Sequence, residues 1–308
     1  MTEKAPTDVS FRAPKFWGVW FGLGVLRLLH ALPVRWQFSL GRMLGKLSYR
    51  VATKRRRITH INLQLCFPEK STEERDLICR QHFEDLGVSL FEMMQAWWAP
   101  DSFFERIVSF EGLDNLKAAQ ESKDGLIIIT GHFSTLEISG RFLRLQVPQF
   151  DAIYRAHRNP LLDQKIRQGR QRSARALIEK SDIRSMVRSL RDGVAVWYAP
   201  DQSYRKKYAE LLDFFGVPAM TNTATGRLAA LGKAAVVPFY CARIPGTLRY
   251  KVRFEPALDS DALDDKALTE AFIKSLEDAT RDHPSQYFWV HRKFKERPAP
   301  LPDVYAKN

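Results

Sequence analysis

Cysteine is scarce in this chain of 308 residues. There are three cysteines, Cys66, Cys79 and Cys241, at unrelated spacings. This small, odd number excludes a disulfide-rich scaffold and a cysteine-rich zinc module, and it suits a reducing compartment. The chain is not short of core-forming residues, since 45% of its residues are hydrophobic and 12% are aromatic. A disordered or collagen-like protein is therefore excluded as well.

Several motifs of familiar catalytic chemistries are also absent. The sequence has no Gly-x-Ser-x-Gly elbow, no P-loop, no dinucleotide fingerprint and no HExxH pair. Serine-nucleophile, nucleotide-dependent and zinc-protease chemistries therefore lose support, and we expect neither a metal nor a cofactor. No linker rich in Gly, Ser or Pro divides the chain. Its length therefore favours one large α/β domain over two small ones.

Negative charge is rare at the N-terminal end. The whole chain has 48 Lys and Arg against 35 Asp and Glu, a net charge of +13. Residues 1–60 alone carry 12 basic against 2 acidic residues, a net charge of +10. A protein that binds nucleic acid through its main domain should carry the excess charge on that domain. The location of the charge therefore favours a membrane surface over nucleic acid.

The longest uncharged apolar run extends from Phe16 to Leu26. It is too short to cross a hydrocarbon core of about 30 Å, which takes about 20 helical residues. Extension to Val34 reaches a spanning length only if Arg27 and His30 lie inside the segment. We expect a membrane anchor, in a spanning or an in-plane form. A core helix of the folded domain is the alternative.

Residues around this run support the membrane interpretation. Trp17, Trp20 and Trp36 flank it as interfacial anchors do, and the cluster Lys54–Arg57 would lie against anionic headgroups. The run is not expected to be a cleaved signal peptide, because no small-x-small site follows it and the basic residues lie mainly after it. We therefore predict an N-terminal anchor and basic segment over residues 1–58 and the main domain over residues 59–308.

Apolar periodicity predicts a mixed sheet covered by helices. The run Gly125–Gly131 indicates a strand that is buried on both faces. Strands and helices alternate along the chain, which is typical of an α/β fold. The other expected strands are Ala152–Arg155, Val194–Tyr198, Ala235–Cys241, Leu248–Phe254 and Tyr287–Val290. The expected helices are 72–98, 135–145, 160–180, 183–191, 221–232 and 262–282.

A histidine and a glutamate follow the first buried strand. His132 and Glu137 are five residues apart, which separates them by about 140° on one helix and puts them on opposite faces of a strand. They can meet only if His132 lies in the strand-to-helix turn and Glu137 on the helix that follows. Gly131 would give the turn backbone freedom, and Ser134 or Thr135 would cap the helix.

Such a pair could act as a general base. A carboxylate bonded to one imidazole nitrogen fixes the tautomer, leaves the other nitrogen free to accept a proton, and stabilises the imidazolium that forms. A substrate hydroxyl could then be deprotonated without a protein nucleophile. A structural histidine is the alternative, because this spacing alone is common.

Two further features are candidates for ligand binding. The stretch 155–175 holds seven Lys or Arg against one Asp, Asp163, and Asn159 followed by Pro160 is a typical helix start. The stretch could be a solvated basic face, or a site for a phosphate or a developing oxyanion. Asp201 follows the strand that ends at Tyr198, at the expected sheet edge of His132, where it would orient an arginine or cap a turn.

Ordered blocks through nearly the whole chain resemble the late acyltransferases of lipid A biosynthesis, and most closely the lauroyltransferase type. The blocks include FWGVWFGLGVL at 16, INLQLCFPE at 61, GHFSTLE at 131, YRAHRNPL at 154, GRQRS at 169, VWYAPDQ at 196 and QYFWVHRKFKERP at 286. The wider glycerolipid acyltransferases share the His-x4-acid pair. They usually carry a Glu-Gly-Thr-Arg block where this chain reads APDQSY, which points away from glycerophosphate as the acceptor.

The resemblance implies an enzyme of the bacterial inner membrane with its acyltransferase domain on the cytoplasmic side. It would move a fatty acyl group, lauroyl by preference, from acyl carrier protein to a 3-hydroxyacyl chain of the di-Kdo lipid A precursor. Carried over by position, His132 is the general base, Glu137 its orienting partner, and Arg170 a phosphate or oxyanion ligand. Arg155, Arg158, Asn159, Arg167 and Asp201 would assist substrate binding.

Other functions remain open from the sequence. A myristoyl-type enzyme of the same pathway and an acyltransferase of another membrane glycolipid are the catalytic alternatives. The non-enzymatic alternative is a membrane-bound or nucleic-acid-binding scaffold that uses the basic N-terminal segment, in which His132 and Glu137 would be dispensable.

Overall fold

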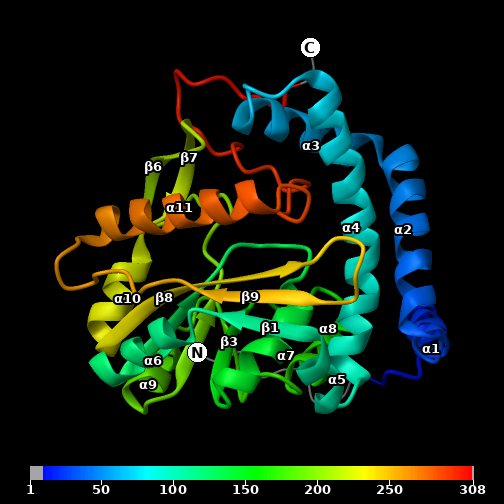
Figure 1. The fold of residues 1–308 in the computed structure, drawn as a ribbon, viewed down its shortest axis with the longest axis horizontal. Helices are drawn as coiled ribbons and strands as arrows, with labels where there is room; N and C mark the ends of the chain where they lie inside the picture. The colour runs from blue at the N-terminus through cyan, green and yellow to red at the C-terminus, as the bar shows by residue number, and fades with distance from the viewer. Residues whose placement is uncertain (1–9, 307–308) are drawn as a thin grey trace.

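The structure, a computed structural model, describes residues 10–306 (Figure 1). Its strands are β1 (Val108–Glu111), β2 (Gly125–Ile129), β3 (Phe150–Tyr154), β4 (Ala176–Glu179), β5 (Ala195–Tyr198), β6 (Ala209–Phe214), β7 (Val217–Asn222), β8 (Ala234–Arg243) and β9 (Tyr250–Phe254). Seven of them form one sheet in the order β1-β9-β8-β2-β5-β3-β4, and β6 and β7 form a separate antiparallel pair. Strands β8, β2, β5, β3 and β4 run parallel, whereas β9 and β1 run the other way. The expected mixed sheet is confirmed.

Helices cover both faces of this sheet (Figure 1). They are α1 (Trp17–His30), α2 (Val34–Val51), α3 (Thr53–Cys66), α4 (Thr72–Trp98), α5 (Asp101–Ile107), α6 (Leu113–Ser122), α7 (Leu136–Gln146), α8 (Pro160–Arg170), α9 (Ile183–Arg191), α10 (Ala224–Gly232) and α11 (Asp265–Asp282), and a short 3-10 turn, η1 (Pro14–Phe16), precedes α1. All five residues of β2 are buried. Ile127 and Ile129 face a core that includes side chains of α9, α10 and α11. Leu126 and Ile128 face a core with side chains of α4, α6 and α7.

Helix α4 forms over the predicted residues, and its sequence explains its start. Ser71 Oγ accepts a hydrogen bond from the Glu74 amide, and Glu74 Oε2 accepts one from the Ser71 amide. This reciprocal capping box satisfies two amide groups at the start of the helix. Helix α2 lies along α4 (Figure 1). The contact is close because a Cβ atom added at Gly45 would lie 2.3 Å from the carbonyl oxygen of Phe83.

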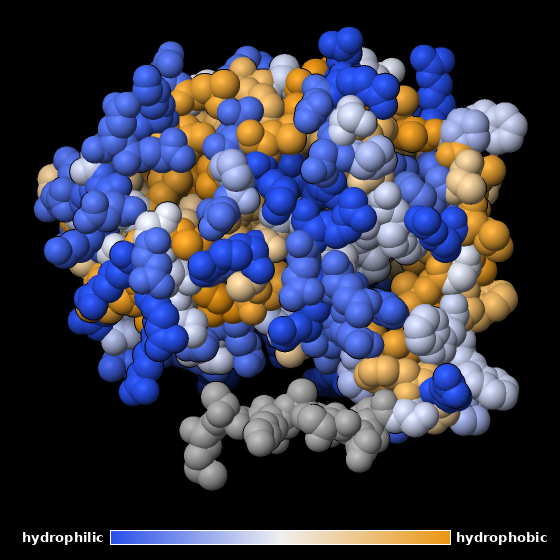
Figure 2. Space-filling view, turned by 90° about the horizontal axis from the view of Figure 1, so that it is seen from below, coloured by the Kyte–Doolittle hydropathy of each residue, from blue (hydrophilic) through white to orange (hydrophobic). Residues whose placement is uncertain are grey.

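Large apolar side chains are exposed on the outward faces of α1 and α2. Figure 2 shows hydrophobic side chains gathered on the side of the molecule that these helices occupy. Large exposed side chains on them are Trp17, Phe21, Leu28, Trp36, Met43, Leu47 and Val51. Within residues 10–306, no helix combines the length and the apolar character that crossing a membrane requires. The predicted boundary after residue 58 falls inside α3 and stays a prediction, and residues 1–9 of the predicted anchor lie outside the described part of the chain.

Some expected elements are wrong. The predicted helix 160–180 ends at Arg170, where the amides of Ser173 and Ala174 bond to its carbonyl group, and β4 follows beside β3. The predicted strand Tyr287–Val290 is an isolated bridge between Tyr287 and Phe133, followed by tight turns. Strands β1, β6 and β7 were not expected. Residues 221–223 of the predicted helix 221–232 belong to β7 and the turn after it, because α10 begins only at Ala224.

Candidate active site

His132 lies in the loop between β2 and α7. Its place after the buried strand is the predicted one. The contacts that fix the loop differ from the predicted ones. Gly131 packs closely against α11, since an added Cβ would lie 2.4 Å from Leu276 Cδ1. The predicted side-chain cap is not formed: Thr135 occupies the cap position, yet its hydroxyl donates to the carbonyl oxygen of Cys241 in β8, 2.6 Å away. The loop is therefore fixed to the neighbouring strand.

The partner of the His132 imidazole is Asp201. His132 Nδ1 lies 2.5 Å from Asp201 Oδ1, and the His132 amide donates to Asp201 Oδ2 over 2.9 Å. The two residues meet because β2 pairs in parallel with β5, with Ile129 opposite Tyr198. Their chain continuations therefore leave the sheet at the same edge. The histidine side chain is 27% exposed and that of Asp201 is 1% exposed.

The Asp201 carboxyl group is buried but ionised. Burial alone would raise its pKa, but the His132 imidazole and the Lys293 ammonium group outweigh burial and hold the pKa of Asp201 well below its usual value. An ionised carboxylate has no proton to donate, so Nδ1 of His132 carries the proton of their shared hydrogen bond. The lone pair of a neutral imidazole is then on Nε2, which is free to accept a proton.

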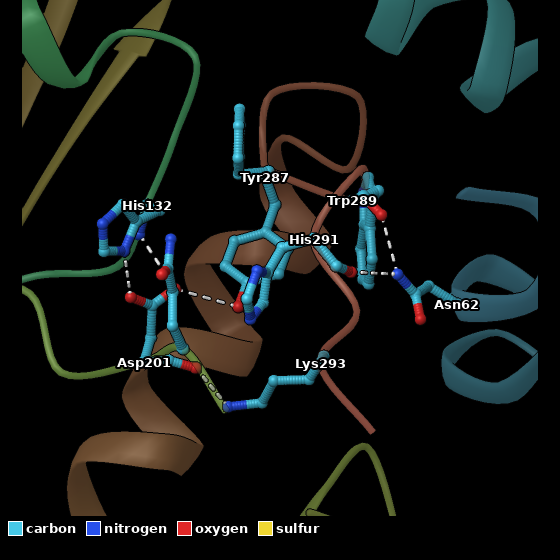
Figure 3. A pocket seen from close by; sticks show the side chains of 9 residues that line it. Asn62, His132, Asp201, Tyr287, Trp289, His291 and Lys293 are labelled. Atoms are coloured by element: carbon cyan, nitrogen blue, oxygen red, sulfur yellow. Dashed lines mark hydrogen bonds and ion pairs between the residues drawn. The ribbon is translucent and has the colours of Figure 1, made fainter. Parts of the chain in front are cut away.

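The C-terminal segment, residues 283–306, forms the other wall of the site (Figure 3). Tyr287 Oη donates to Asp201 Oδ2 over 3.0 Å, and Lys293 Nζ donates to the backbone carbonyl of Asp201. His291 Nε2 accepts a hydrogen bond from the Ser203 amide over 3.3 Å, and burial lowers the pKa of His291 to about 4. His291 is therefore neutral at physiological pH. It lines the same small pocket as His132, together with Asn62, Asp201, Gln202, Tyr287, Phe288, Trp289 and Lys293.

Glu137 does not orient His132, which corrects the expected histidine–glutamate dyad. Within residues 10–306, no hydrogen bond or ion pair joins the two side chains. Glu137 pairs with Arg170 at the end of α8: Arg170 Nε lies 3.1 Å from Oε1 and 3.3 Å from Oε2, and Nη2 also donates to Oε1. A guanidinium offers a carboxylate a two-pronged charged contact that a single imidazole nitrogen cannot match. Both side chains remain partly exposed, Arg170 at 31% and Glu137 at 25%.

The other predicted binding residues fall into two groups. Arg155 and Arg158 are exposed in the loop after β3. Asn159 and Arg167 have internal contacts, since the Asn159 side-chain oxygen caps α8 by accepting from the Leu161 and Leu162 amides, and Arg167 donates to the Tyr154 hydroxyl. Arg155 and Arg158 are therefore the residues of this set best placed to meet a ligand from solution.

The basic cluster Lys54–Arg57 is also used differently from the prediction. Arg55 donates to the Val290 carbonyl over 3.1 Å, Arg56 to the Tyr49 carbonyl over 2.9 Å, and Arg57 to the Tyr305 carbonyl over 3.0 Å. Three of the four side chains thus bind backbone oxygens of this chain. The expectation that the whole cluster lies against headgroups is corrected, because Arg55 and Arg57 fasten the C-terminal segment to α3.

Sequence reasoning missed the contribution of the C-terminal segment. Tyr287 and Lys293 belong to the block QYFWVHRKFKERP, which stood out only as part of a family resemblance. A lysine within an aromatic stretch was the available signal, since a lysine that packs among aromatic rings needs an acidic or carbonyl partner. Over residues 10–306, no cluster of His, Cys, Asp and Glu side chains is arranged to hold a metal ion.

Comparison with known proteins identifies relatives over nearly the whole chain. The family model described as "Bacterial lipid A biosynthesis acyltransferase" matches residues 4–296. The lipid A biosynthesis lauroyltransferase of Escherichia coli K12 is 36% identical over 99% of this chain and 100% of its own length. The palmitoleoyltransferase of the same strain is also 36% identical, over 96% of this chain and 97% of its own. The myristoyltransferase of that strain is 28% identical over 94% of this chain and 90% of its own length.

Proposed function

The chain belongs to the bacterial lipid A biosynthesis acyltransferases, and we propose that it transfers a fatty acyl group from acyl carrier protein to a hydroxyl of the lipid A precursor with His132 as general base. The His132–Asp201 pair carries this proposal. It supplies a partly exposed proton acceptor backed by a buried carboxylate, which is what attack by a neutral alcohol on a thioester requires. The acceptor hydroxyl would be that of a 3-hydroxyacyl chain on the di-Kdo precursor.

The proposed reaction needs no covalent enzyme intermediate. The acceptor oxygen bonds to the thioester carbonyl carbon while its proton passes to His132 Nε2. Asp201 stabilises the imidazolium through Nδ1–H. The tetrahedral intermediate then collapses as the carbon–sulfur bond breaks, and the proton passes from the imidazolium to the thiolate that leaves. A positioned base of this kind contributes roughly 10²–10⁴-fold in rate.

Glu137 and Arg170 have a supporting role in this proposal. Arg170 uses Nε and Nη2 to bind Glu137, and Nη1 has no hydrogen-bond partner among residues 10–306. Burial would lower the pKa of Arg170, but Glu137 outweighs it and raises that pKa, so the guanidinium stays charged. We assign Arg170 to a substrate phosphate or to the oxyanion, and Glu137 to the positioning of Arg170.

The exposed cations beside the site fit an anionic substrate. Partial burial lowers the pKa of Lys180, and the nearby charges of Arg155 and Lys206 lower it further. These three side chains come from loops at the carboxyl edge of the parallel strands, the edge that also bears His132 and Asp201. Such a group of like charges is costly without a counter-ion and favours a ligand with phosphates or carboxylates. The lipid A precursor and an acidic carrier protein both fit.

We place the enzyme at the inner membrane, with its catalytic domain on the cytoplasmic side. The outward side chains of α1 and α2 supply the contact, in the in-plane form of the anchor (Figure 2). Trp17 and Trp36 are 64% and 66% exposed. Indole rings at the headgroup level and apolar side chains below it are typical of helices that lie in the interface.

The experiment that tests this function is an assay of purified full-length protein with defined acyl carrier protein thioesters and the precursor as acceptor. Lauroyl, palmitoleoyl and myristoyl donors should be compared, because the lauroyl and palmitoleoyl relatives are equally similar at 36% identity. We propose lauroyl as the preferred chain. Product with one added secondary acyl chain supports the proposal. An unmodified acceptor with every donor, or transfer only to another glycolipid, refutes it.

A further inference from the structure

The C-terminal segment binds Asp201 through two hydrogen bonds. Tyr287 binds its carboxylate, and Lys293 binds its backbone carbonyl. The segment also closes on the histidine loop, since the Phe288 amide donates to the His132 carbonyl over 2.9 Å and the Ser134 amide donates to the Gln286 carbonyl over 2.7 Å. One stretch of chain therefore contacts both members of the pair, although it follows β9 and α11 rather than the strands that carry them.

Helix α3 fixes this segment from behind. Asn62 Nδ2 donates to the carbonyl groups of Trp289 and His291 over 2.7 and 2.8 Å, and Asn62 Oδ1 accepts from the Tyr305 hydroxyl over 2.5 Å. Asn62 is fully buried. A buried amide with both ends satisfied defines one arrangement of the backbone it binds. Tyr287 and Lys293 therefore reach Asp201 from a rigid support.

Lys293 places a buried amine beside the catalytic pair. It is 3% exposed, and its Nζ lies 4.8 Å from the centre of the Phe214 ring. Burial lowers the pKa of Lys293, whereas the nearby carboxylates of Asp201 and Glu277 and the thiol of Cys66 oppose that shift. These acidic neighbours favour the protonated amine, whose charge in turn acts on the Asp201–His132 pair.

We propose that Tyr287 and Lys293 are positioning residues that hold Asp201 ionised and aimed at His132 Nδ1. Tyr287 occupies the oxygen that also accepts the His132 amide, which leaves Oδ1 to the imidazole. Lys293 balances the buried negative charge and holds the backbone of the Asp201 loop. The C-terminal segment is thus part of the catalytic machinery, although neither side chain touches the reacting atoms. The kinetic consequence rests on the function proposed above, whereas the effect on His132 does not.

The charges around the pair fix the direction of the expected change. Asp201 faces His132 from the loop after β5, and Tyr287, His291 and Lys293 come from the C-terminal segment. Lys293 is the cation of this set, because His291 is neutral. Without it, the buried Asp201 carboxylate loses a compensating charge and a backbone contact, so its hydrogen bond with Nδ1–H of His132 weakens.

The test is NMR spectroscopy of the His132 ring at alkaline pH in full-length protein in detergent, labelled with ¹³C and ¹⁵N at histidine and assigned with His132→Ala. The wild type should show the Nδ1–H tautomer alone, whereas in Lys293→Met both tautomers should be populated, so that the two ring ¹⁵N signals move toward each other. In Tyr287→Phe, which keeps the ring, the same change should be smaller, and kcat should fall about tenfold at constant KM. Lys295→Met removes a partly exposed charge of the same segment and should leave the ring signals unchanged. Thermal unfolding of every variant checks that it is folded.

Ring ¹⁵N signals of His132 that keep their wild-type positions in both Lys293→Met and Tyr287→Phe would overturn the inference. If Lys293→Met does not fold, the near-isosteric Tyr287→Phe alone decides, by the same spectra. If the wild-type protein transfers no acyl group, the proposed function fails, but the spectra still test the arrangement around Asp201. The two failures are therefore distinguishable.

Discussion

Asp201 holds His132 at two places, through the imidazole Nδ1 and through the backbone amide. The side chain and the main chain of the histidine are thus fixed by one carboxylate group. The imidazole is therefore oriented before any substrate binds, which is the condition for efficient proton transfer.

Replacement of His132 should abolish transfer without unfolding the protein. We expect His132→Ala to lower kcat by at least roughly 10²–10⁴-fold, because the proton acceptor is lost. Steady-state assay of purified protein measures this, with circular dichroism as the check on folding. His60→Ala is the matched control, since His60 lies on α3 and its side chain pairs with Asp76 on α4. Near-normal activity of His132→Ala would refute the general-base role.

The Glu137–Arg170 ion pair should behave as one unit. Glu137→Gln and Arg170→Gln should each lower kcat/KM about tenfold or more, because each breaks the same charged contact. The double variant should lose little beyond the larger single loss, which a double-mutant cycle measures. The exposed pair of Lys117 and Glu121 provides the control cycle and should show no effect. Additive losses would mean that the two residues act separately.

Acid should destabilise the protein through His82. This side chain is fully buried, its Nδ1 bonds to the Ser285 carbonyl, and burial lowers its pKa to about 4. The unfolded chain, with a histidine pKa near 6.5, binds this proton more readily. The contribution of His82 to the free energy of unfolding is therefore fully present above about pH 6.5. It is lost, by roughly 3 kcal/mol, as the pH falls from 6.5 to 4.

Chemical unfolding at several pH values measures the contribution of His82. Because His291 is also buried with a lowered pKa, only part of the acid loss belongs to His82. His82→Gln should remove the His82 share of the pH dependence of the free energy of unfolding. This holds even if the substitution also changes the stability at neutral pH. The exposed substitution His157→Gln should leave the dependence as it is. A pH dependence that persists in full in His82→Gln would contradict the assignment.

The apolar face of α1 and α2 should set the affinity for membranes. Met43 and Leu47 are 59% and 53% exposed on one side of α2. We expect Met43→Glu with Leu47→Glu to weaken binding to anionic vesicles at least about tenfold, because buried side chains of this size contribute about 1.5–3 kcal/mol each. The control is Leu231→Glu on α10, where the leucine side chain is 43% exposed. This variant should bind the vesicles as the wild type does. Equal binding of all variants in a flotation assay would refute the in-plane contact.

The sequence was enough to place His132 and Asp201 at one sheet edge. Each follows a short apolar run, and the carboxyl ends of parallel strands meet. It was not enough to choose the partner of His132. Glu137 is near in the sequence, whereas Asp201 is 69 residues away, and the contact depends on the pairing of β2 with β5. The pairing of two strands so far apart in the chain leaves no pattern in the sequence around either residue.

The elements that were missed have no clear local signal either. The turn between β6 and β7 uses Phe215 and Gly216, both in the left-handed region with φ of 55° and 69°. A phenylalanine is uncommon there, so the hairpin did not show as a turn motif. Strand β4 follows a basic helix after five residues and carries only four residues itself. By contrast, α4 has both a long apolar pattern and a capping box, and its bounds were predicted correctly.

The most direct test of the account compares Asp201→Asn with Glu137→Gln in the pH dependence of kcat/KM for acyl transfer. Loss of the ionised carboxylate removes the support for the imidazolium, so Asp201→Asn should lower the rate by roughly 10²–10⁴-fold and move the acidic limb to lower pH. Glu137→Gln should lower the rate, but the acidic limb of its pH profile should lie at the same pH as in the wild type. Asp213→Asn, an exposed position on β6, should match the wild type. A limb that moves in Glu137→Gln and stays fixed in Asp201→Asn would contradict Asp201 as the partner of the catalytic histidine.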